Sequence, residues 1–399
     1  MFAFLWRHQP FRAIYILWKL YTTGIFWIPL WVTVAVIPFF RPRRSWSVVK
    51  TIKVQLIRRL GDVSAVTGPL FSEPDHTDIV PTADGAGVWV NPAPDLIIGP
   101  VKLWASITGV LPARIPGYWM HPRGSTKAVG APPVAGEKVL YSLHGGGFTE
   151  GSAHPDHIIS NAARRIVDSS KTVRRVFAIE YRLSSASHGK RANPFPAALV
   201  DALAGYKYLV EDVGFAPKDI IVEGDSAGGG LALTLVRYLV EHIDSGLLPP
   251  PGALLLLSPW VDLGCSHDVP SPPPRRLFVA DFDPEPTGWD DAKDAYIGPA
   301  LGQGFADMSP YVSPASKHPA ADVSFARFPR TFIAAGGAEN LLPQIRLLRD
   351  RMVRDLGPAE GGGKVAYFEA DDEAHDYLIF GFQPGTRNAL ARLSTWLDS

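Results

Sequence analysis

Short apolar, β-branched runs alternate with amphipathic stretches over the last two thirds of the chain. The apolar runs predict strands, and they cover residues 138–143, 174–181, 220–223, 253–257, 330–335 and 364–369. The amphipathic stretches have apolar residues three and four positions apart, as helices do, and they cover residues 197–210, 228–243, 341–355 and 386–397. Strands and helices in alternation predict an α/β fold with a mainly parallel central sheet and helices on both faces.

The start of the chain has another pattern. Between Thr22 and Phe40 it is uncharged and almost wholly apolar, which is long enough to span a bilayer. A cleaved signal peptide fits poorly, because this run exceeds the apolar core of such peptides and no small-residue cleavage pattern follows. Pro29 and Pro38 interrupt a straight helix. Three arrangements therefore stay open: a single span, a re-entrant or monotopic insertion, and a buried core helix. We predict that residues 1–46 form a membrane anchor.

Residues 47–116 are the least regular part of the sequence. Val54, Ile57 and Leu60 repeat at helical spacing beside basic residues, which predicts a basic amphipathic helix. Such a helix can follow the membrane surface, or it can be a cap helix with a solvated basic face. We expect an amphipathic linker or cap over this region, and a catalytic domain with the candidate chemistry over residues 117–399.

One predicted strand ends in a glycine-rich turn with a serine at its centre. The segment Gly224-Asp225-Ser226-Ala227-Gly228 lies between the β-branched run and a helical pattern. A strand–turn–helix of this kind lifts the serine hydroxyl above the sheet edge, and small residues two before and two after it keep strand and helix apart. Ser226 is therefore a candidate nucleophile, with the Ala227 N–H able to face developing negative charge. The alternative is a glycine-rich turn with an incidental serine.

A second glycine-rich segment follows the first predicted strand of the sheet. His144 is followed by Gly145, Gly146 and Gly147, so backbone N–H groups can approach a substrate carbonyl oxygen without side chains in the way. We predict an oxyanion hole formed by these three glycines and Ala227. A flexible loop stays open as an alternative, whereas a phosphate loop would need Lys-Ser or Lys-Thr after the glycines, which is absent here.

The acid and base candidates follow the last two predicted strands. Glu339 lies just past residues 330–335 and His375 just past residues 364–369. The carboxyl ends of parallel strands meet at one rim of a sheet, so both residues are expected beside Ser226. No other histidine follows Glu339 in the chain. We predict a triad of Ser226 as nucleophile, His375 as base and Glu339 as acid.

These motifs resemble the hormone-sensitive-lipase-like branch of the α/β-hydrolases, from about Glu137 to the C-terminus. Further matching segments are Gly151-Ser152, Tyr181-Arg182-Leu183, Pro194 to Ala198 with Asp201, and Ser258-Pro259-Trp260. The resemblance implies an α/β-hydrolase fold with an N-terminal cap, and a carboxylesterase or lipase-type serine hydrolase that acts on small or lipophilic esters. Acetyl esters of sterols or other hydrophobic alcohols are one candidate substrate class. No metal or organic cofactor is implied, because backbone donors stabilise the charge.

The sequence departs from this family pattern at four places. Glu339 stands where the family has aspartate, and Gly230 where it has asparagine. Residues 184–191 replace an expected Pro-Glu, which leaves the loop facing the pocket unpredictable. His375 is followed by Asp376, where glycine is more common in the family.

Charge and cysteine content exclude several other classes. Lysines and arginines balance aspartates and glutamates at 39 each, so the basic surface of a nucleic-acid-binding protein is missing. The single cysteine, Cys265, excludes an internal disulfide and a cysteine-clustered metal site. Two alternatives to an esterase stay open: a serine peptidase, and a non-catalytic ligand-binding module on a hydrolase scaffold. The sequence does not specify an oligomeric state.

Charge around the apolar run suggests an orientation in the membrane. More basic residues follow it than precede it, which favours a cytosolic catalytic domain on the endoplasmic reticulum or another endomembrane. Membrane-anchored relatives that face the lumen keep the opposite orientation open.

Overall fold

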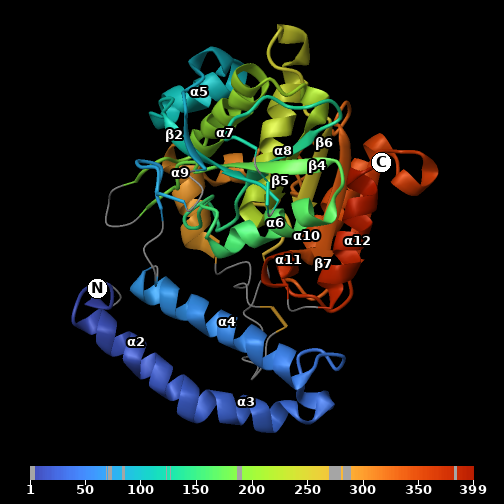
Figure 1. Ribbon diagram of the computed structural model, residues 1–399. Helices are drawn as coiled ribbons and strands as arrows, with labels where there is room; N and C mark the ends of the chain where they lie inside the picture. Colours follow the sequence, from blue (N-terminus) through green and yellow to red (C-terminus); the bar gives the residue numbers. More distant parts are fainter. Residues whose placement is uncertain are drawn as a thin grey trace.

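An eight-stranded sheet crosses the centre of the molecule (Figure 1). The computed structural model describes residues 5–68, 70, 74–82, 86–122, 124–125, 127–186, 191–268, 280–281, 289–381 and 384–399. The strand order is β1-β2-β4-β3-β5-β6-β7-β8, and all pairs from β4 to β8 are parallel. The strands are β1 (Gly87–Val90), β2 (Ile115–Met120), β3 (Lys138–Leu143), β4 (Val173–Ile179), β5 (Ile220–Asp225), β6 (Ala253–Leu257), β7 (Arg330–Gly336) and β8 (Val365–Ala370).

Helices cover both faces of the sheet, as predicted for a mainly parallel arrangement. Side chains alternate between the two faces: Val139 and Tyr141 of β3 pack in one core, and Leu140 packs in the other. The first core includes residues of α5 (Gly99–Thr108), α7 (Ala197–Lys207), α8 (Ser226–Glu241), α9 (Asp290–Met308) and α10 (Leu342–Leu356). The second includes residues of α6 (Asn161–Ser169), α11 (Tyr377–Phe380) and α12 (Gly385–Leu397).

The six predicted strands and four predicted helices of the α/β region are all present, with ends that differ by a few residues. The structure adds β1 and β2, which pair antiparallel at the edge of the sheet. Pro116 and Gly117 interrupt the apolar pattern of β2, and β1 has only four residues, so periodicity did not reveal them. The sheet therefore takes in residues that our expected division of the chain assigned to the cap region before residue 117.

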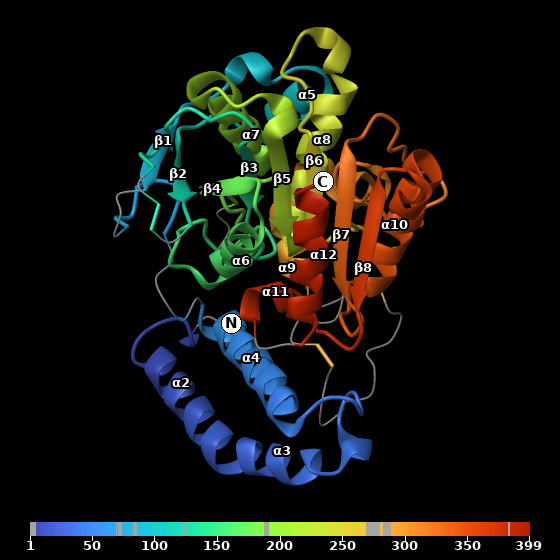
Figure 2. The same cartoon turned by 45° about the vertical axis from the view of Figure 1, so that its right-hand side comes forward.

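The first helices form a separate layer below the sheet (Figures 1 and 2). One continuous helix runs through α2 (Phe11–Thr22), a π-helical turn η1 (Thr23–Trp27) and α3 (Ile28–Ala35). The chain then turns back into α4 (Val48–Thr67), which lies between this helix and the rest of the molecule. The Ser47 hydroxyl caps α4 by accepting a hydrogen bond from the Lys50 N–H.

Candidate active site

Ser226 occupies a sharp turn between β5 and α8. It is the first residue of α8, it is 4 % exposed, and its φ angle of 49° lies in the left-handed region, where non-glycine residues are strained. The turn is tight because a Cβ atom at Gly224 would lie 2.2 Å from the Gly228 carbonyl oxygen. Any larger side chain at Gly224 would push β5 and α8 apart, so the glycine keeps Ser226 at the carboxyl edge of the sheet.

The glycine-rich segment after β3 lies beside this turn, and it supplies fewer free donors than expected. The Gly145 N–H donates to Asp225 Oδ2 at 3.1 Å, so it is not available to an oxyanion. Within the described part of the chain, the N–H groups of Gly146 and Gly147 donate no hydrogen bond, and both glycines have positive φ angles, 107° and 60°. These two groups and the Ala227 N–H at the start of α8 are the remaining candidate donors.

The candidate acid and base are in direct contact. Glu339 follows β7 and His375 follows β8, and Glu339 Oε2 lies 2.8 Å from His375 Nδ1. The other carboxylate oxygen of Glu339 accepts the Gly336 N–H at 2.7 Å, which fixes the side chain. Glu339 and His375 are 4 % and 3 % exposed, and burial raises the pKa of the Glu339 carboxyl, although its hydrogen bond with His375 opposes this. The longer glutamate therefore reaches the histidine in place of the family's aspartate.

The sequence did not reveal Asp281, which joins the two loops that hold this pair. Its Oδ1 accepts the His375 N–H at 3.0 Å, and its Oδ2 accepts the Asn340 N–H at 2.7 Å. The side chain is fully buried. Asp281 lies in an irregular, acid-rich stretch of sequence, where no pattern separates a buried carboxylate from solvated neighbours. Part of that stretch, and the Pro272-Pro273-Pro274 segment before it, lies outside the described residues, as do residues 187–190 of the expected pocket loop.

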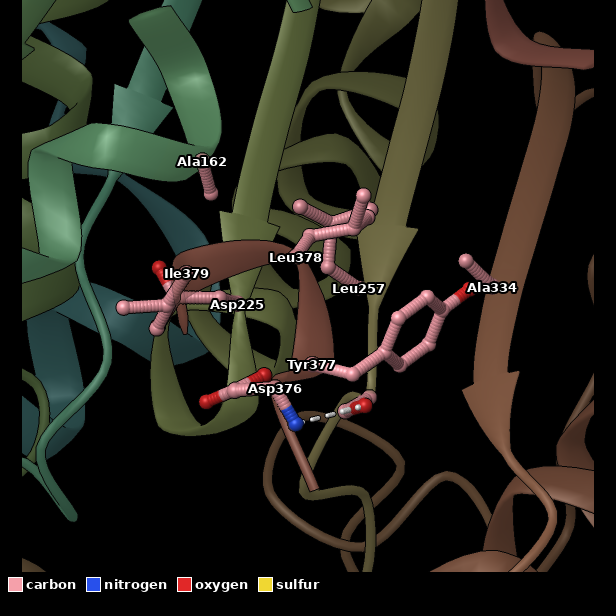
Figure 3. Close-up of a pocket in the computed structure, with 9 residues that line it drawn as sticks. Ala162, Asp225, Leu257, Ala334, Asp376, Tyr377, Leu378 and Ile379 are labelled. Carbon is pink, nitrogen blue, oxygen red and sulfur yellow. Dashed lines mark hydrogen bonds between the residues drawn. The ribbon is translucent and has the colours of Figure 1, made fainter. Parts of the chain in front are cut away.

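Asp376, which stands where the family more often has glycine, contacts the other nitrogen of the candidate base. Asp376 Oδ2 lies 3.1 Å from His375 Nε2, and no hydrogen bond joins His375 to Ser226 among the described residues. Figure 3 shows Asp376 and Asp225 lining one small pocket, with the Asp376 N–H bonded to Ser258 Oγ at 3.2 Å. In this structure the imidazole therefore lies between two carboxylates.

Because two carboxylates stabilise a protonated imidazole, we expect Asp376→Asn to extend ester hydrolysis to lower pH. A base must lose its Nε2 proton before it can act, and one fewer adjacent negative charge makes that loss easier, so the acid limb of the pH–rate profile should move to lower pH. Glu339, Asp225 and Asp281 stay around His375 in both proteins. Asn also tolerates the positive φ angle of 46° at this position.

The check is kcat/KM measured from pH 5 to 9 on a soluble ester. Exposed Asp371, four residues before His375, gives the matched control Asp371→Asn, which should leave the profile in place. An acid limb that stays fixed in Asp376→Asn would contradict the interpretation.

Glu223 is a buried carboxyl beneath the turn that holds Ser226. Burial raises its pKa to about 7, a hydrogen bond with Ser142 opposes the rise, and the charge of Asp376 adds to it. The folded state thus holds a proton that the unfolded chain releases above about pH 4.5, so stability falls as pH rises from about 4.5 to 7. Above pH 7 the cost of ionising the buried Glu223 carboxyl lowers the free energy of unfolding by roughly 3 kcal/mol.

We expect Glu223→Gln to stabilise the protein strongly at pH 8 and little at pH 5, because glutamine resembles the neutral carboxyl and never ionises. Urea unfolding at both pH values measures the difference. The exposed Glu360 provides the control variant Glu360→Gln, which should not change this pH dependence. An equal gain at both pH values would show that Glu223 is ionised in the folded protein.

The remaining motif residues hold the site together. Arg182 pairs with the fully buried Asp201 through several hydrogen bonds, one of them at 2.8 Å from Nη2 to Oδ1. Phe148, next to the glycines, stacks on Tyr296 of α9 with ring centroids 3.7 Å apart. A Cβ atom at Gly147 would come within 3.3 Å of the Trp289 ring. Aromatic side chains thus lie beside the glycine-rich segment.

The strained turn at Ser226 and the buried pair of Glu339 and His375 follow the carboxyl ends of β5, β7 and β8 in one parallel sheet. Residues 140–379 match the sequence pattern of the α/β hydrolase fold family. Because this match covers more than half of the chain, the protein belongs to the α/β hydrolase fold family.

Known relatives of the chain are ester-cleaving enzymes by name. An acetyl-hydrolase of Streptomyces hygroscopicus is 38% identical over 130 residues, which are 33% of this chain and 38% of the relative. Esterase LipU of Mycobacterium tuberculosis is 29% identical over 251 residues, 59% of this chain and 70% of that one. The crystal structure of a hormone-sensitive lipase from a metagenome library superimposes with a TM-score of 0.51 and 25% identity, over 71% of this chain and 81% of its own. These similarities support the prediction of a carboxylesterase or lipase-type hydrolase.

Proposed function

We propose that this protein is a serine carboxylic-ester hydrolase with Ser226, His375 and Glu339 as its catalytic triad. The observation that supports this best is the buried contact of 2.8 Å between Glu339 Oε2 and His375 Nδ1. The pair lies at the same rim of the sheet as Ser226, which follows β5. A carboxylate on Nδ1 orients the imidazole and leaves Nε2 to accept a proton. The names of the relatives agree with this chemistry.

The proposed reaction has two halves. The His375 side chain first turns Nε2 away from Asp376. Ser226 Oγ then attacks the ester carbonyl carbon while His375 Nε2 takes the hydroxyl proton. The N–H groups of Gly146, Gly147 and Ala227 bind the oxyanion that forms. His375 then gives that proton to the leaving alcohol, which leaves an acyl ester on Ser226. Water attacks the acyl carbon in the second half, its proton passes to His375 and on to Ser226, and the acid departs.

We propose small or lipophilic esters as the substrates, with acetyl esters of sterols or other hydrophobic alcohols as one class. Support comes from the aromatic side chains of Phe148 and Trp289 beside the glycine-rich segment, and from a relative named acetyl-hydrolase. The test is labelling by a fluorophosphonate, followed by turnover of p-nitrophenyl esters of increasing acyl length. An unlabelled Ser226 together with no turnover would favour a non-catalytic ligand-binding module.

We also propose that residues 1–46 anchor the protein to an endomembrane such as the endoplasmic reticulum, with the catalytic domain in the cytosol. The helix Phe11–Ala35 is long and apolar enough to cross a membrane, and only 6% of its most apolar window is buried. Fractionation of cells at physiological pH and salt tests the anchor, since a protein without one would be recovered with the soluble proteins.

A further inference from the structure

We propose that α2, η1, α3 and α4 form a hairpin that lies flat on an anionic lipid surface and holds the rim of the sheet with Ser226 towards the membrane. This goes beyond anchoring, because it assigns the membrane-contacting face, excludes a transmembrane span, and makes the bilayer the source of substrate.

The apolar helix is fixed at its middle by a charged side chain of α4. Arg59 donates hydrogen bonds to Thr23 Oγ1 and, at 3.2 Å, to Thr22 Oγ1, and its guanidinium group lies 5.1 Å from the Trp27 ring centre. These partners lie at the centre of the helix Phe11–Ala35. A helix that spans the bilayer would carry Arg59 to the middle of the hydrocarbon, where a charged group is costly. Lying flat, the same contacts stay at the level of the lipid headgroups.

The other side of α4 is docked on the loops of the catalytic pair. Lys50 Nζ lies 2.6 Å from Glu373 Oε2 and is buried, and the Trp46 indole N–H donates to the Asp372 carbonyl oxygen at 2.5 Å. Trp46 and Val54 share a small apolar core with Ala338, the residue before Glu339. The hairpin therefore cannot leave the catalytic domain without breaking a buried ion pair next to His375.

The face of the hairpin that points away from α4 is apolar and uncovered. Six of its large apolar side chains are each more than half exposed: Ile14, Leu17, Trp18, Tyr21, Ile25 and Phe26. A contiguous apolar face of this kind marks a surface that binds a partner or a membrane. Figure 2 shows this helix as the outermost layer, with α4 between it and the sheet.

Charge identifies an anionic lipid surface as the occupant. Residues 1–67 contain ten lysines and arginines and one acidic residue, Asp62, whereas the whole chain is neutral. Lys50 is buried against Glu373 and Arg43 lies beside Asp372, but the segment stays basic without these two. A second copy of the same hairpin would bring two basic segments together, which is unfavourable. Basic residues beside an exposed apolar helix are the pattern of a helix that lies in the interface of an anionic leaflet.

Vesicle binding by the full chain tests the surface. We expect flotation with vesicles of phosphatidylcholine and phosphatidylserine, weaker flotation with phosphatidylcholine alone, and at least about tenfold less bound protein for the double variant Leu17→Asp/Phe26→Asp. Leu103 of α5 is equally exposed, at 59 %, so Leu103→Asp is the matched control and should bind as the parent does. Unchanged binding in the double variant, or a dimer that the double variant disrupts without vesicle binding, would overturn the proposal.

Labelling of single cysteines tests the flat arrangement. In a Cys265→Ser background, Gln9→Cys and Leu103→Cys are reconstituted into sealed vesicles and treated with a membrane-impermeant maleimide, before and after detergent. A flat hairpin gives equal labelled fractions at both sites, whatever the orientation of the protein. A span puts Gln9 and the catalytic domain on opposite sides, so one site would be protected wherever the other is labelled, and that result would overturn the proposal.

The supply of substrate from the bilayer rests on the proposed esterase activity. We expect Leu17→Asp/Phe26→Asp to lose about tenfold in turnover of a long-chain p-nitrophenyl ester dissolved in anionic vesicles, and to keep turnover of soluble p-nitrophenyl acetate. Equal loss on both esters would overturn the access route. If the parent protein cleaves neither ester, the proposed function fails, and the labelling result still decides the arrangement of the hairpin.

Discussion

Replacing Ser226 by alanine is expected to lower kcat on p-nitrophenyl esters by about 10⁴-fold or more, while the protein stays folded. The hydroxyl at the turn between β5 and α8 is the proposed attacking group, and the remaining oxyanion donors give only a small residual rate. Since alanine removes one buried oxygen and relieves no contact of the turn, thermal unfolding should be little affected.

The measurement pairs steady-state turnover with fluorophosphonate labelling and mass spectrometry of the labelled peptide. Ser160→Ala is the matched control, because it also removes a buried hydroxyl, one that donates to the His154 carbonyl oxygen at 2.9 Å. That variant should keep its activity and its label. Full turnover by Ser226→Ala, or a label on another serine, would refute the mechanism.

The second large effect is expected at Glu339. In Glu339→Gln the side chain cannot both accept the His375 Nδ1–H and stabilise a positive imidazole, and we expect kcat to fall by about 10⁴-fold. Glu339→Asp keeps the charge but shortens the side chain, so it cannot reach His375 Nδ1 and the Gly336 N–H together at 2.8 and 2.7 Å. A misplacement of this size costs about 10²-fold.

The relative activities of Glu339→Gln and Glu339→Asp distinguish the effect of the carboxylate charge from the effect of side-chain length. If the carboxylate charge matters most, Glu339→Asp is the more active variant at every pH. The nearby acids are the controls: Asp372 is bonded to Ser45 and lies 3.7 Å from Arg43, and Asp371 is exposed, so neither faces His375. A mild Glu339→Gln with a severe Asp371→Asn or Asp372→Asn would mean that another acid orients the base.

The prediction of an α/β-hydrolase fold is confirmed, because the signals that identify it are local. The periodicity of a strand or helix can be recognised from a few consecutive residues. The same holds for the two glycines, Gly224 and Gly228, that the tight turn requires. The positions of Ser226, Glu339 and His375 after three parallel strands placed all three at one rim of the sheet, and the structure brings Glu339 and His375 into contact there. The roles of these residues stay predictions until the variants are measured.

Other features of the site depend on partners far apart in sequence. Nothing local shows that Gly145 gives its N–H to Asp225, and the expected oxyanion donors therefore included one group too many. Asp281 lies 94 residues from the histidine that it holds. The two edge strands were not revealed by periodicity: β2 forms because β4 offers it an unpaired edge, and β1 then pairs with β2.

The sequence by itself determined the layered fold, the strained turn at Ser226, and the apolar, basic character of the first 67 residues, because each follows from local spacing and composition. Only the tertiary structure decided what those residues contact. Length and hydropathy cannot distinguish a helix across a bilayer from one along it, since both need the same apolar residues. The contacts of Arg59 with Thr22 and Thr23 place a charged group at the middle of the apolar helix. The ion pair of Lys50 with Glu373 ties α4 to the loop of His375.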